Sequence, residues 1–181
     1  MDREMSPQAK ANLQLAAAIL LAVVAGSFVF LRTSRFRKSS EENAKTWFYD
    51  ESEKRLYAAP HGTIPPDQGI GGKSGDGVRA VVVAPASQQN DPARRQIAYL
   101  ETYTTELKQL LEKIKAGRAS RLPRLGPMPS RDSPFFQTNT LVRRLEETDW
   151  YPESSAQGRK ILSEWRGWRS PDGQPMVVCL P

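Results

Sequence analysis

One long hydrophobic run stands near the start of the chain, and shorter mixed runs follow it. Residues 13–31 read LQLAAAILLAVVAGSFVFL, which contains no charged residue and has Gln14 as its strongly polar member. A helix of this length would extend about 28 Å, close to the ~30 Å hydrocarbon core of a bilayer. Because no polar face interrupts the run, a helix of a soluble core is disfavoured. We therefore predict a transmembrane helix over residues 13–31, preceded by an N-terminal tail over residues 1–12.

The pattern after this run predicts a small soluble α+β domain over residues 46–181. Trp47, Phe48 and Tyr49 are strong strand formers, and Pro60 suits the end of a strand. The sheet is expected to have few strands and to be either antiparallel or mixed. The expected strands are a hairpin near residues 46–50 and 55–59, a strand over 78–84 after a long loop, and a C-terminal strand within 174–181 that pairs with the 78–84 strand or with the hairpin.

About three helices complete the predicted domain, and the strongest helical pattern lies over residues 91–117. Apolar residues recur there at spacings of three and four, Asp91 can cap the first turn, and Gly117 suits the end. The helix either lies on the sheet or forms a short coiled coil. We favour the sheet, because Thr104 interrupts the short repeat.

Two shorter helices are expected later in the chain. One lies near residues 140–148 with Asn139 as its cap, and the other near 155–165 with Ser154 or Ser155 as its cap. Residues 118–134 contain four prolines and four arginines, so we expect no regular element there.

A cleavable signal peptide is the alternative interpretation of the apolar run. Residues 23–25, VVA, fit a small-residue cleavage site. The apolar sequence FVFL continues beyond that site, however, and the segment before the run has balanced charge. We therefore favour an uncleaved single-pass anchor.

Basic residues are concentrated in a linker directly after the apolar run, over residues 32–45. The chain has a formal net charge of +6, and half of this excess lies in the linker. The positive-inside rule then favours the cytoplasmic face for the soluble domain, although a long domain can cross a membrane regardless of charge. Basic residues beside a bilayer attract anionic headgroups. The candidate headgroup contacts are Arg32, Arg35, Arg37 and Lys38.

The tripeptide GKS at residues 72–74 raises the question of a phosphate-binding loop. Such a loop needs the pattern GxxxxGK[ST], a strand before it and a helix after it. Asp67 stands where the first glycine is required, and the β-branched sequence GVRAVVVA follows the loop. We therefore interpret residues 62–77 as a connector between two β segments.

Residues suited to catalysis or metal binding are sparse. One histidine, His61, and one cysteine, Cys179, cannot supply a zinc site of nitrogen and sulfur ligands, and no nucleophile motif accompanies the histidine. Asp50, Glu51 and Glu53 could bind a cation, but they lack the calcium-loop pattern, so a solvated turn is expected. We expect no enzyme activity, no catalytic or metal-binding residue and no cofactor.

Three other features have alternative interpretations. Residues 165–171, WRGWRSP, can stack bases and grip phosphates. They can equally place Trp165 and Trp168 in the core, or at a membrane interface with the arginines outside, and we favour the core. Cys179 lies in an apolar run and is expected to be buried and unreactive. The arginines of residues 118–131 can contact phosphates or headgroups, but a solvated loop is favoured. Nucleic acid is therefore an unfavoured partner.

The order of elements resembles a group of small single-span bacterial membrane proteins of unknown function. The matching sequences are WFYD, PP, GVRA, YLETYT and PDG, at residues 47–50, 65–66, 77–80, 99–104 and 171–173. The resemblance extends over most of the soluble part. It implies the layout of an anchor followed by a small domain, and it implies no activity.

Two functions of different classes are consistent with these patterns. The first is a membrane-anchored interaction or structural module that binds an unidentified protein partner without catalysis. The second is a protein that binds the membrane surface or an anionic polymer (lipid or nucleic acid) through the arginine-rich segments. The two differ in their expected salt dependence, because phosphate contacts are screened by salt.

Overall fold

The computed structural model describes residues 44–117 and 130–181, and residues 45–181 form one compact unit. The strands are β1 (Lys45–Asp50), β2 (Arg55–Pro60), β3 (Asp67–Gln68), β4 (Ser74–Pro85), β5 (Gln96–Tyr103), β6 (Thr140–Arg143), β7 (Tyr151–Pro152) and β8 (Met176–Val178). The helices are α2 (Thr105–Lys115), α3 (Pro134–Asn139) and α4 (Ala156–Glu164), with short 3-10 turns η1 (Pro92–Arg94) and η2 (Trp165–Gly167). The domain is therefore α+β.

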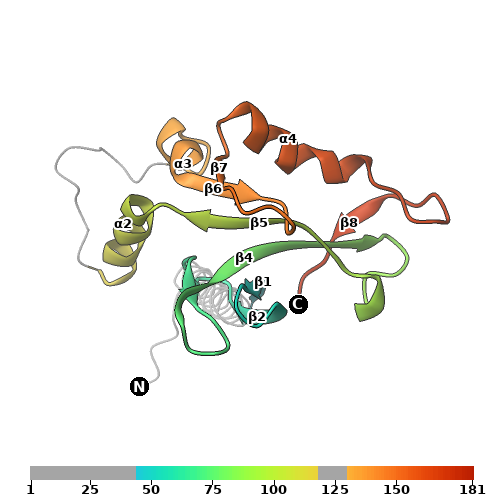
Figure 1. Cartoon of the computed structure of the whole chain (residues 1–181), viewed down its shortest axis with the longest axis horizontal. Helices are drawn as coiled ribbons and strands as arrows, with labels where there is room; N and C mark the ends of the chain where they lie inside the picture. Colours follow the sequence, from blue (N-terminus) through green and yellow to red (C-terminus); the bar gives the residue numbers. More distant parts are fainter. Residues whose placement is uncertain (1–43, 118–129) are drawn as a thin grey trace, which may run out of the picture. The chain divides into compact units, whose positions relative to one another are not determined.

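Every strand pair in the sheet is antiparallel (Figure 1). The main strand order is β2-β1-β4-β5-β6-β7, so β2 is an edge strand, and β3 and β8 both pair with the long strand β4. The predicted hairpin is confirmed, with Lys45 opposite Pro60 and Asp50 opposite Arg55. The predicted pairing of the C-terminal strand with the 78–84 strand is also confirmed, because Val178 lies opposite Val83. Of the two predicted sheet types, the structure has the antiparallel one.

Side chains alternate between two cores along β4. On one face Val78, Ala80 and Val82 pack with Tyr49 and Leu100. On the other face Val83 packs with Ala98 and Met176, and Trp165 and Trp168 cover that cluster. The register shifts between the pairs Val81–Tyr99 and Val82–Ile97, which leaves Ala98 as an extra residue in β5. This bulge turns both Ala98 and Tyr99 toward the second core.

The helix predicted over residues 91–117 is wrong in its first half, where β5 lies. Residues 96–103 pair with β4 on one side and with β6 on the other, so sheet pairing outweighs the helical spacing of their apolar residues. The helix itself begins only after Thr104, whose hydroxyl accepts a hydrogen bond from the backbone of Leu107 at 3.4 Å. Thr104 therefore caps α2 and does not interrupt it.

The helix predicted near residues 140–148 is also wrong. Residues 140–143 form β6, which pairs with β5, and the helix α3 precedes them. Ser133 caps α3 and Pro134 occupies its first turn, so the end of the proline-rich segment starts a helix instead of remaining irregular. Asn139, predicted as a cap, is the last residue of α3.

The prediction of a helix near residues 155–165 is confirmed by α4. The Ser155 hydroxyl accepts from the Gly158 backbone at 2.9 Å and donates to the Pro152 carbonyl at 2.7 Å. Gly158 is buried at this contact, and a Cβ atom there would overlap the Pro152 carbonyl group. Close approach of α4 to β7 therefore requires a glycine at this position.

Replacing Gly158 by alanine is expected to lower the free energy of unfolding by about 2 kcal/mol, because the added methyl group must displace backbone. Denaturation followed by tryptophan fluorescence measures this loss. Gly167→Ala is the matched control, since a Cβ atom at Gly167 has no neighbour within 4 Å. Equal stability of the two variants would contradict the close packing of α4 on β7.

Within the described ranges, no helix combines the length and the apolarity that a bilayer crossing requires. The tail over residues 1–12, the span predicted over 13–31 and the linker up to residue 43 lie outside these ranges. Lys45, predicted as the last linker residue, is the first residue of β1.

Candidate functional site: the Arg143 cleft

An open cleft of about 430 Å³ lies where the β1–β2 turn meets the segment between β6 and β7. We call it the Arg143 cleft. Its lining residues are Glu51, Lys54, Arg143, Leu145, Glu146, Glu147, Thr148 and Trp150. Most of these residues belong to one short segment, LEETDW, which follows Arg144. The conformation of that segment therefore determines the shape of the cleft.

Arg143 fixes this segment through hydrogen bonds to its backbone. Its side chain is buried, and one terminal nitrogen donates to the carbonyls of Arg144 at 3.2 Å and Leu145 at 3.1 Å, and also to that of Glu147. The other terminal nitrogen forms an ion pair with Glu51 of the β1–β2 turn. The guanidinium carbon lies 4.8 Å from the centre of the Trp150 ring, in cation–π geometry. One arginine thus joins both walls of the cleft.

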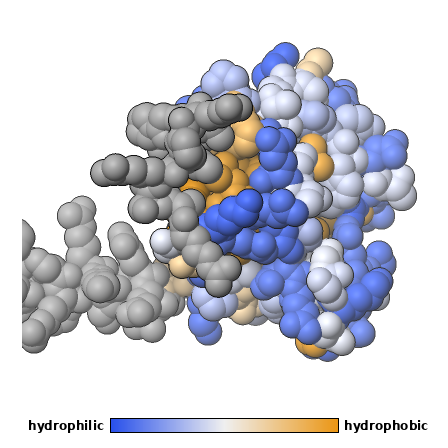
Figure 2. Space-filling view, turned by 90° about the vertical axis from the view of Figure 1, so that its left-hand side faces the viewer, coloured by the Kyte–Doolittle hydropathy of each residue, from blue (hydrophilic) through white to orange (hydrophobic). Residues whose placement is uncertain are grey.

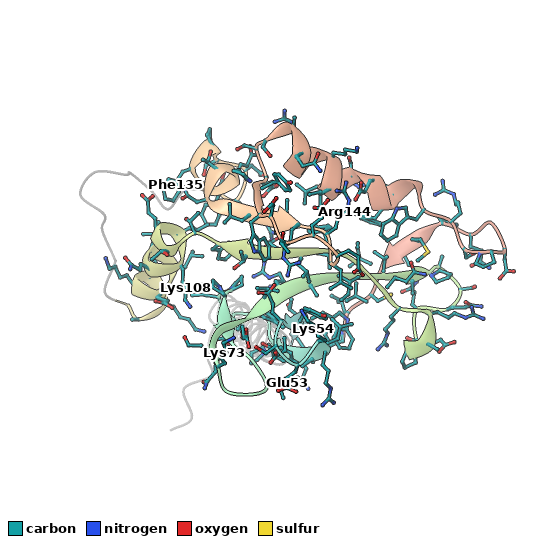
Figure 3. The ribbon with its side chains drawn as sticks, viewed as in Figure 1. Glu53, Lys54, Lys73, Lys108, Phe135 and Arg144 are labelled. Atoms are coloured by element: carbon teal, nitrogen blue, oxygen red, sulfur yellow. The ribbon has the colours of Figure 1, made fainter. Side chains whose placement is uncertain are left out.

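Arg144 joins the same segment to α4. Its guanidinium forms two hydrogen bonds with the Glu164 carboxylate of α4, at 2.5 and 2.6 Å, and pairs with Glu147. The hydrogen bonds that Arg144 donates to Glu164, followed by the one that it donates to Glu147, raise the pKa of Arg144 above its ordinary value. In Figure 3 Arg144 lies beside α4. Residues 144–150 are therefore fixed to the sheet by one arginine and to α4 by the next.

The rim of the Arg143 cleft carries exposed charges of both signs. Lys54 stands on one side, in a left-handed backbone conformation with φ of 53°, and Glu146 stands on the other. Thr148 and the half-buried Trp150 complete the rim. Glu51, on the wall of the cleft, is engaged by Arg143 in an ion pair.

The glycine loop that contains GKS does surround an anion, but that anion is the Asp50 carboxylate. Asp50 is fully buried and accepts hydrogen bonds from the backbone of Ile70 at 2.6 Å and Gly71 at 3.5 Å. It also accepts from Ser52 at 3.0 Å and Glu53 at 2.8 Å. The bond from Glu53 is the main cause that lowers the pKa of Asp50, and the bonds from the loop act in the same direction.

Further contacts hold this loop against the β1–β2 hairpin turn. A Cβ atom at Gly69 would overlap the Asp50 carboxylate, so the loop can approach that group only with a glycine there. Lys73 of the GKS sequence contacts the Ser52 hydroxyl at 3.2 Å and the Asp76 carboxylate at 3.5 Å. Figure 3 shows Glu53, Lys54 and Lys73 on the side of the domain where the hairpin turn meets this loop. The strand predicted after the loop is confirmed as β4.

The acidic turn is thus not a uniformly solvated cluster. Asp50 is buried, Glu51 is paired with Arg143, and Glu53 is exposed. The prediction of a solvated turn is correct for Glu53 and wrong for Asp50. Within the described residues, no group of three or more His, Cys, Asp or Glu side chains is placed to hold a metal ion.

A second polar cluster lies on the sheet around Glu101. This buried carboxylate is paired with Arg79 of the neighbouring strand at 2.7 Å and with Arg131 at 2.9 Å. Arg131, expected in a solvated loop, is therefore engaged in an ion pair, and the charge of Glu101 raises its pKa. Burial, and then repulsion by Glu101, raises the pKa of the nearby Glu153. Burial raises the pKa of Tyr99 to about 12.

Other residues singled out in the sequence have ordinary structural environments. His61 is exposed, and its ring lies 3.1 Å from the Thr46 hydroxyl. Cys179 is buried as predicted, and burial raises the pKa of its thiol. Trp165 and Trp168 pack partly buried against the second core, which confirms that interpretation.

The predicted headgroup contacts Arg32, Arg35, Arg37 and Lys38 lie outside the described residues, as do the first three arginines of the 118–131 segment. The residues that shape the cleft, Arg143 and Arg144, were not singled out in the sequence. One signal for them exists. An RR pair at the end of a strand, followed directly by LEE, places two long cations where nearby carboxylates and carbonyls can accept their hydrogen bonds.

No protein family, curated protein or solved structure matches this chain. The function proposed next therefore depends on the geometry of the described residues and on the sequence pattern.

Proposed function

We propose that this chain is a single-pass membrane protein whose domain binds a protein partner at the Arg143 cleft without performing catalysis. The observation that carries the proposal is the fixation of residues 144–150 by two adjacent arginines. An exposed segment is held in one conformation, at the cost of burying the guanidinium of Arg143. Such rigidity favours binding, because little conformational freedom is then lost when a partner docks.

The chemistry of the cleft favours a polypeptide as the partner. The indole of Trp150 provides a large, rigid contact surface, as aromatic residues do at interface centres. Lys54 and Glu146 can pair with opposite charges on a partner and so determine its orientation. On the face of the domain that carries α2, Figure 2 shows a group of hydrophobic side chains bordered by hydrophilic ones. This group does not belong to the lining of the Arg143 cleft, and the proposal does not depend on it.

The anchor in this proposal is the apolar run over residues 13–31, uncleaved, with the domain on the cytoplasmic face. Its support is the absence of charge over the length of a bilayer core and the excess of basic residues directly after it. The residues expected to contact headgroups are Arg32, Arg35, Arg37 and Lys38. Alkaline extraction of isolated membranes tests the anchor, since an integral chain stays in the pellet.

Reversing a rim charge is expected to weaken partner binding about tenfold without unfolding the domain. Lys54→Glu and Glu146→Lys each replace an attractive contact with a repulsive one, and both positions are exposed. Affinity purification of the tagged full-length protein from gently solubilised membranes, with quantitative mass spectrometry, measures how much of each co-purifying protein each variant retains.

Lys113→Glu on α2 is the matched control for this experiment, because it makes the same charge change on an exposed residue outside the cleft. The proposal predicts one or more proteins retained by the wild type and by the control but reduced in both rim variants. An identical set of retained proteins in all four samples would exclude the Arg143 cleft as the binding site.

A further inference from the structure

The outer face of α4 carries positive charge only. Side chains at spacings of three and four lie on one stripe of a helix. On α4 the exposed stripe consists of Ala156, Arg159, Lys160 and Ser163, and it continues through Arg166 and Gly167 of η2 to Arg169. The opposite face, which includes Gly158 and Ile161, is buried against the domain. Three exposed basic side chains therefore lie on the outer side of α4 and η2, and the exposed Arg169 follows in the extended segment after η2.

These four cations have no carboxylate partner within the described residues. The salt bridges of the domain involve other basic residues, and Glu164, the acidic residue of α4, is held by Arg144 on the flank of the helix. Arg159 and Arg169 instead donate to nearby backbone carbonyls, of Ser154 and of Arg166 and Trp168. These contacts fix the guanidinium groups but do not neutralise them. The stripe remains electropositive.

Two tryptophans lie at the C-terminal end of this stripe. Trp165 and Trp168 are partly buried against the second core, and the guanidinium of Arg166 lies 5.8 Å from the Trp165 ring centre. Indoles next to basic residues are characteristic of surfaces that rest at the boundary between headgroups and acyl chains. An exposed group of cations next to indoles on the outside of a helix matches an anionic surface better than it matches a concave ligand site.

We propose that the stripe formed by Arg159, Lys160, Arg166 and Arg169 docks on an anionic lipid surface, a proposal that rests on the membrane anchor proposed above. The first residue of β1 is Lys45, so 13 residues separate the predicted span from the fold. Fully extended, they reach at most about 45 Å. Such a tether keeps the domain at high effective concentration near the headgroups, where a weak electrostatic contact is sufficient.

The test uses the full chain reconstituted in vesicles, with an environment-sensitive fluorophore at Ser163→Cys in a Cys179→Ala background. The vesicles are either phosphatidylcholine alone or phosphatidylcholine with roughly one third phosphatidylglycerol, to supply negative surface charge. We expect the emission to shift to the blue, and to be quenched by spin-labelled lipid, only in the anionic vesicles. High salt should reverse both effects because it screens the contact. A label at Ala58→Cys on β2, at the other end of the strand order, should not respond.

Changing the four basic residues to glutamine should lower the ratio of docked to undocked domains by roughly fivefold per residue. The matched control changes four exposed basic residues elsewhere to glutamine, with the same loss of charge, and should dock like the wild type. These control residues are Arg55, Arg94, Lys113 and Lys115. A silent Ser163 label, an equal response in neutral vesicles, or an equal loss in the control would each overturn the proposal. A response that requires an added protein instead of anionic lipid would also overturn it.

Failure of the anchor gives a different result from failure of the stripe. If alkali releases the chain from membranes, the anchor is wrong, and the same labelled chain is then mixed with preformed vesicles. A blue shift that occurs with the anionic vesicles and not with the neutral ones would still support docking by the stripe. The absence of any such shift would refute it.

Discussion

Replacing Arg143 by methionine is expected to lower the free energy of unfolding by about 3 kcal/mol, the range found when one partner of a buried ion pair is removed. Methionine fills a similar volume but leaves the Glu51 carboxylate without its cation. It also leaves three carbonyls of the 144–147 segment without their donor. Denaturation followed by fluorescence measures the loss, because all four tryptophans, at positions 47, 150, 165 and 168, lie in the domain.

The same variant is expected to release the segment between β6 and β7. Backbone hydrogen exchange over residues 144–150 should rise toward that of an open loop, and retention of the partner should fall with it. Arg143→Lys separates charge from shape, since a lysine keeps the cation but cannot donate to Glu51 and to several carbonyls at once. If the lysine variant matches the wild type in stability and exchange, the planar guanidinium is not what holds the cleft.

The second large effect is expected at Asp50. Asp50→Asn removes a buried carboxylate that accepts four backbone hydrogen bonds and puts an amide donor against one or more of those N–H groups. We expect Tm to fall on the order of 10 °C, which thermal unfolding of the full-length protein measures. Because Ile70 and Gly71 lose their acceptor, the glycine loop should also become susceptible to proteolysis.

The effect of Asp50 depends on pH in a direction that follows from its pKa. The pKa of Asp50 in the folded protein is lowered from the ordinary value of 3.8. Because the pKa of Asp50 is lower in the folded protein than in the unfolded one, its carboxylate stabilises the fold fully at pH values above the unfolded-state pKa. This stabilisation is lost as the pH falls through the folded-state pKa. The difference in Tm between the wild type and Asp50→Asn should therefore be constant above about pH 5 and shrink at lower pH.

Asp91→Asn is the matched control for this titration. Asp91 caps the turn η1 through a single hydrogen bond from Ala93, and asparagine keeps a capping oxygen. Its Tm should stay close to that of the wild type at neutral pH. A difference between wild type and Asp50→Asn that does not change on acidification would show that the charge of Asp50 contributes nothing to holding the loop.

Local patterns predicted the parts of the fold in which one signal dominates. The hairpin follows from strand formers on both sides of a polar turn, and α4 follows from a serine cap before an apolar stripe. β5 was misassigned because its apolar residues also fit helical spacing, and only pairing with β4 and β6 decides between the two. That pairing joins residues far apart in the chain, so no local window contains it.

The candidate site was less predictable than the fold. The sequence predicts a connector in place of a phosphate loop, but it does not show that Asp50 occupies the space inside the glycine loop, because the pairing of the hairpin with β4 brings the two together. The pairing of Glu51 with Arg143 joins residues 92 positions apart. The adjacent RR pair is visible in the sequence, whereas two of the carboxylates that accept from it, Glu51 and Glu164, come from the β1–β2 turn and from α4.

The edge strand β2 carries features that oppose pairing with a strand of another chain. An uncovered strand edge invites copies of a chain to pair into aggregates, and the proposed anchor would make such encounters frequent by confining the copies to two dimensions. β2 is only six residues long, begins with the charged Arg55 and ends with Pro60, which has no N–H to offer a neighbouring strand. These features oppose pairing with another chain along this edge.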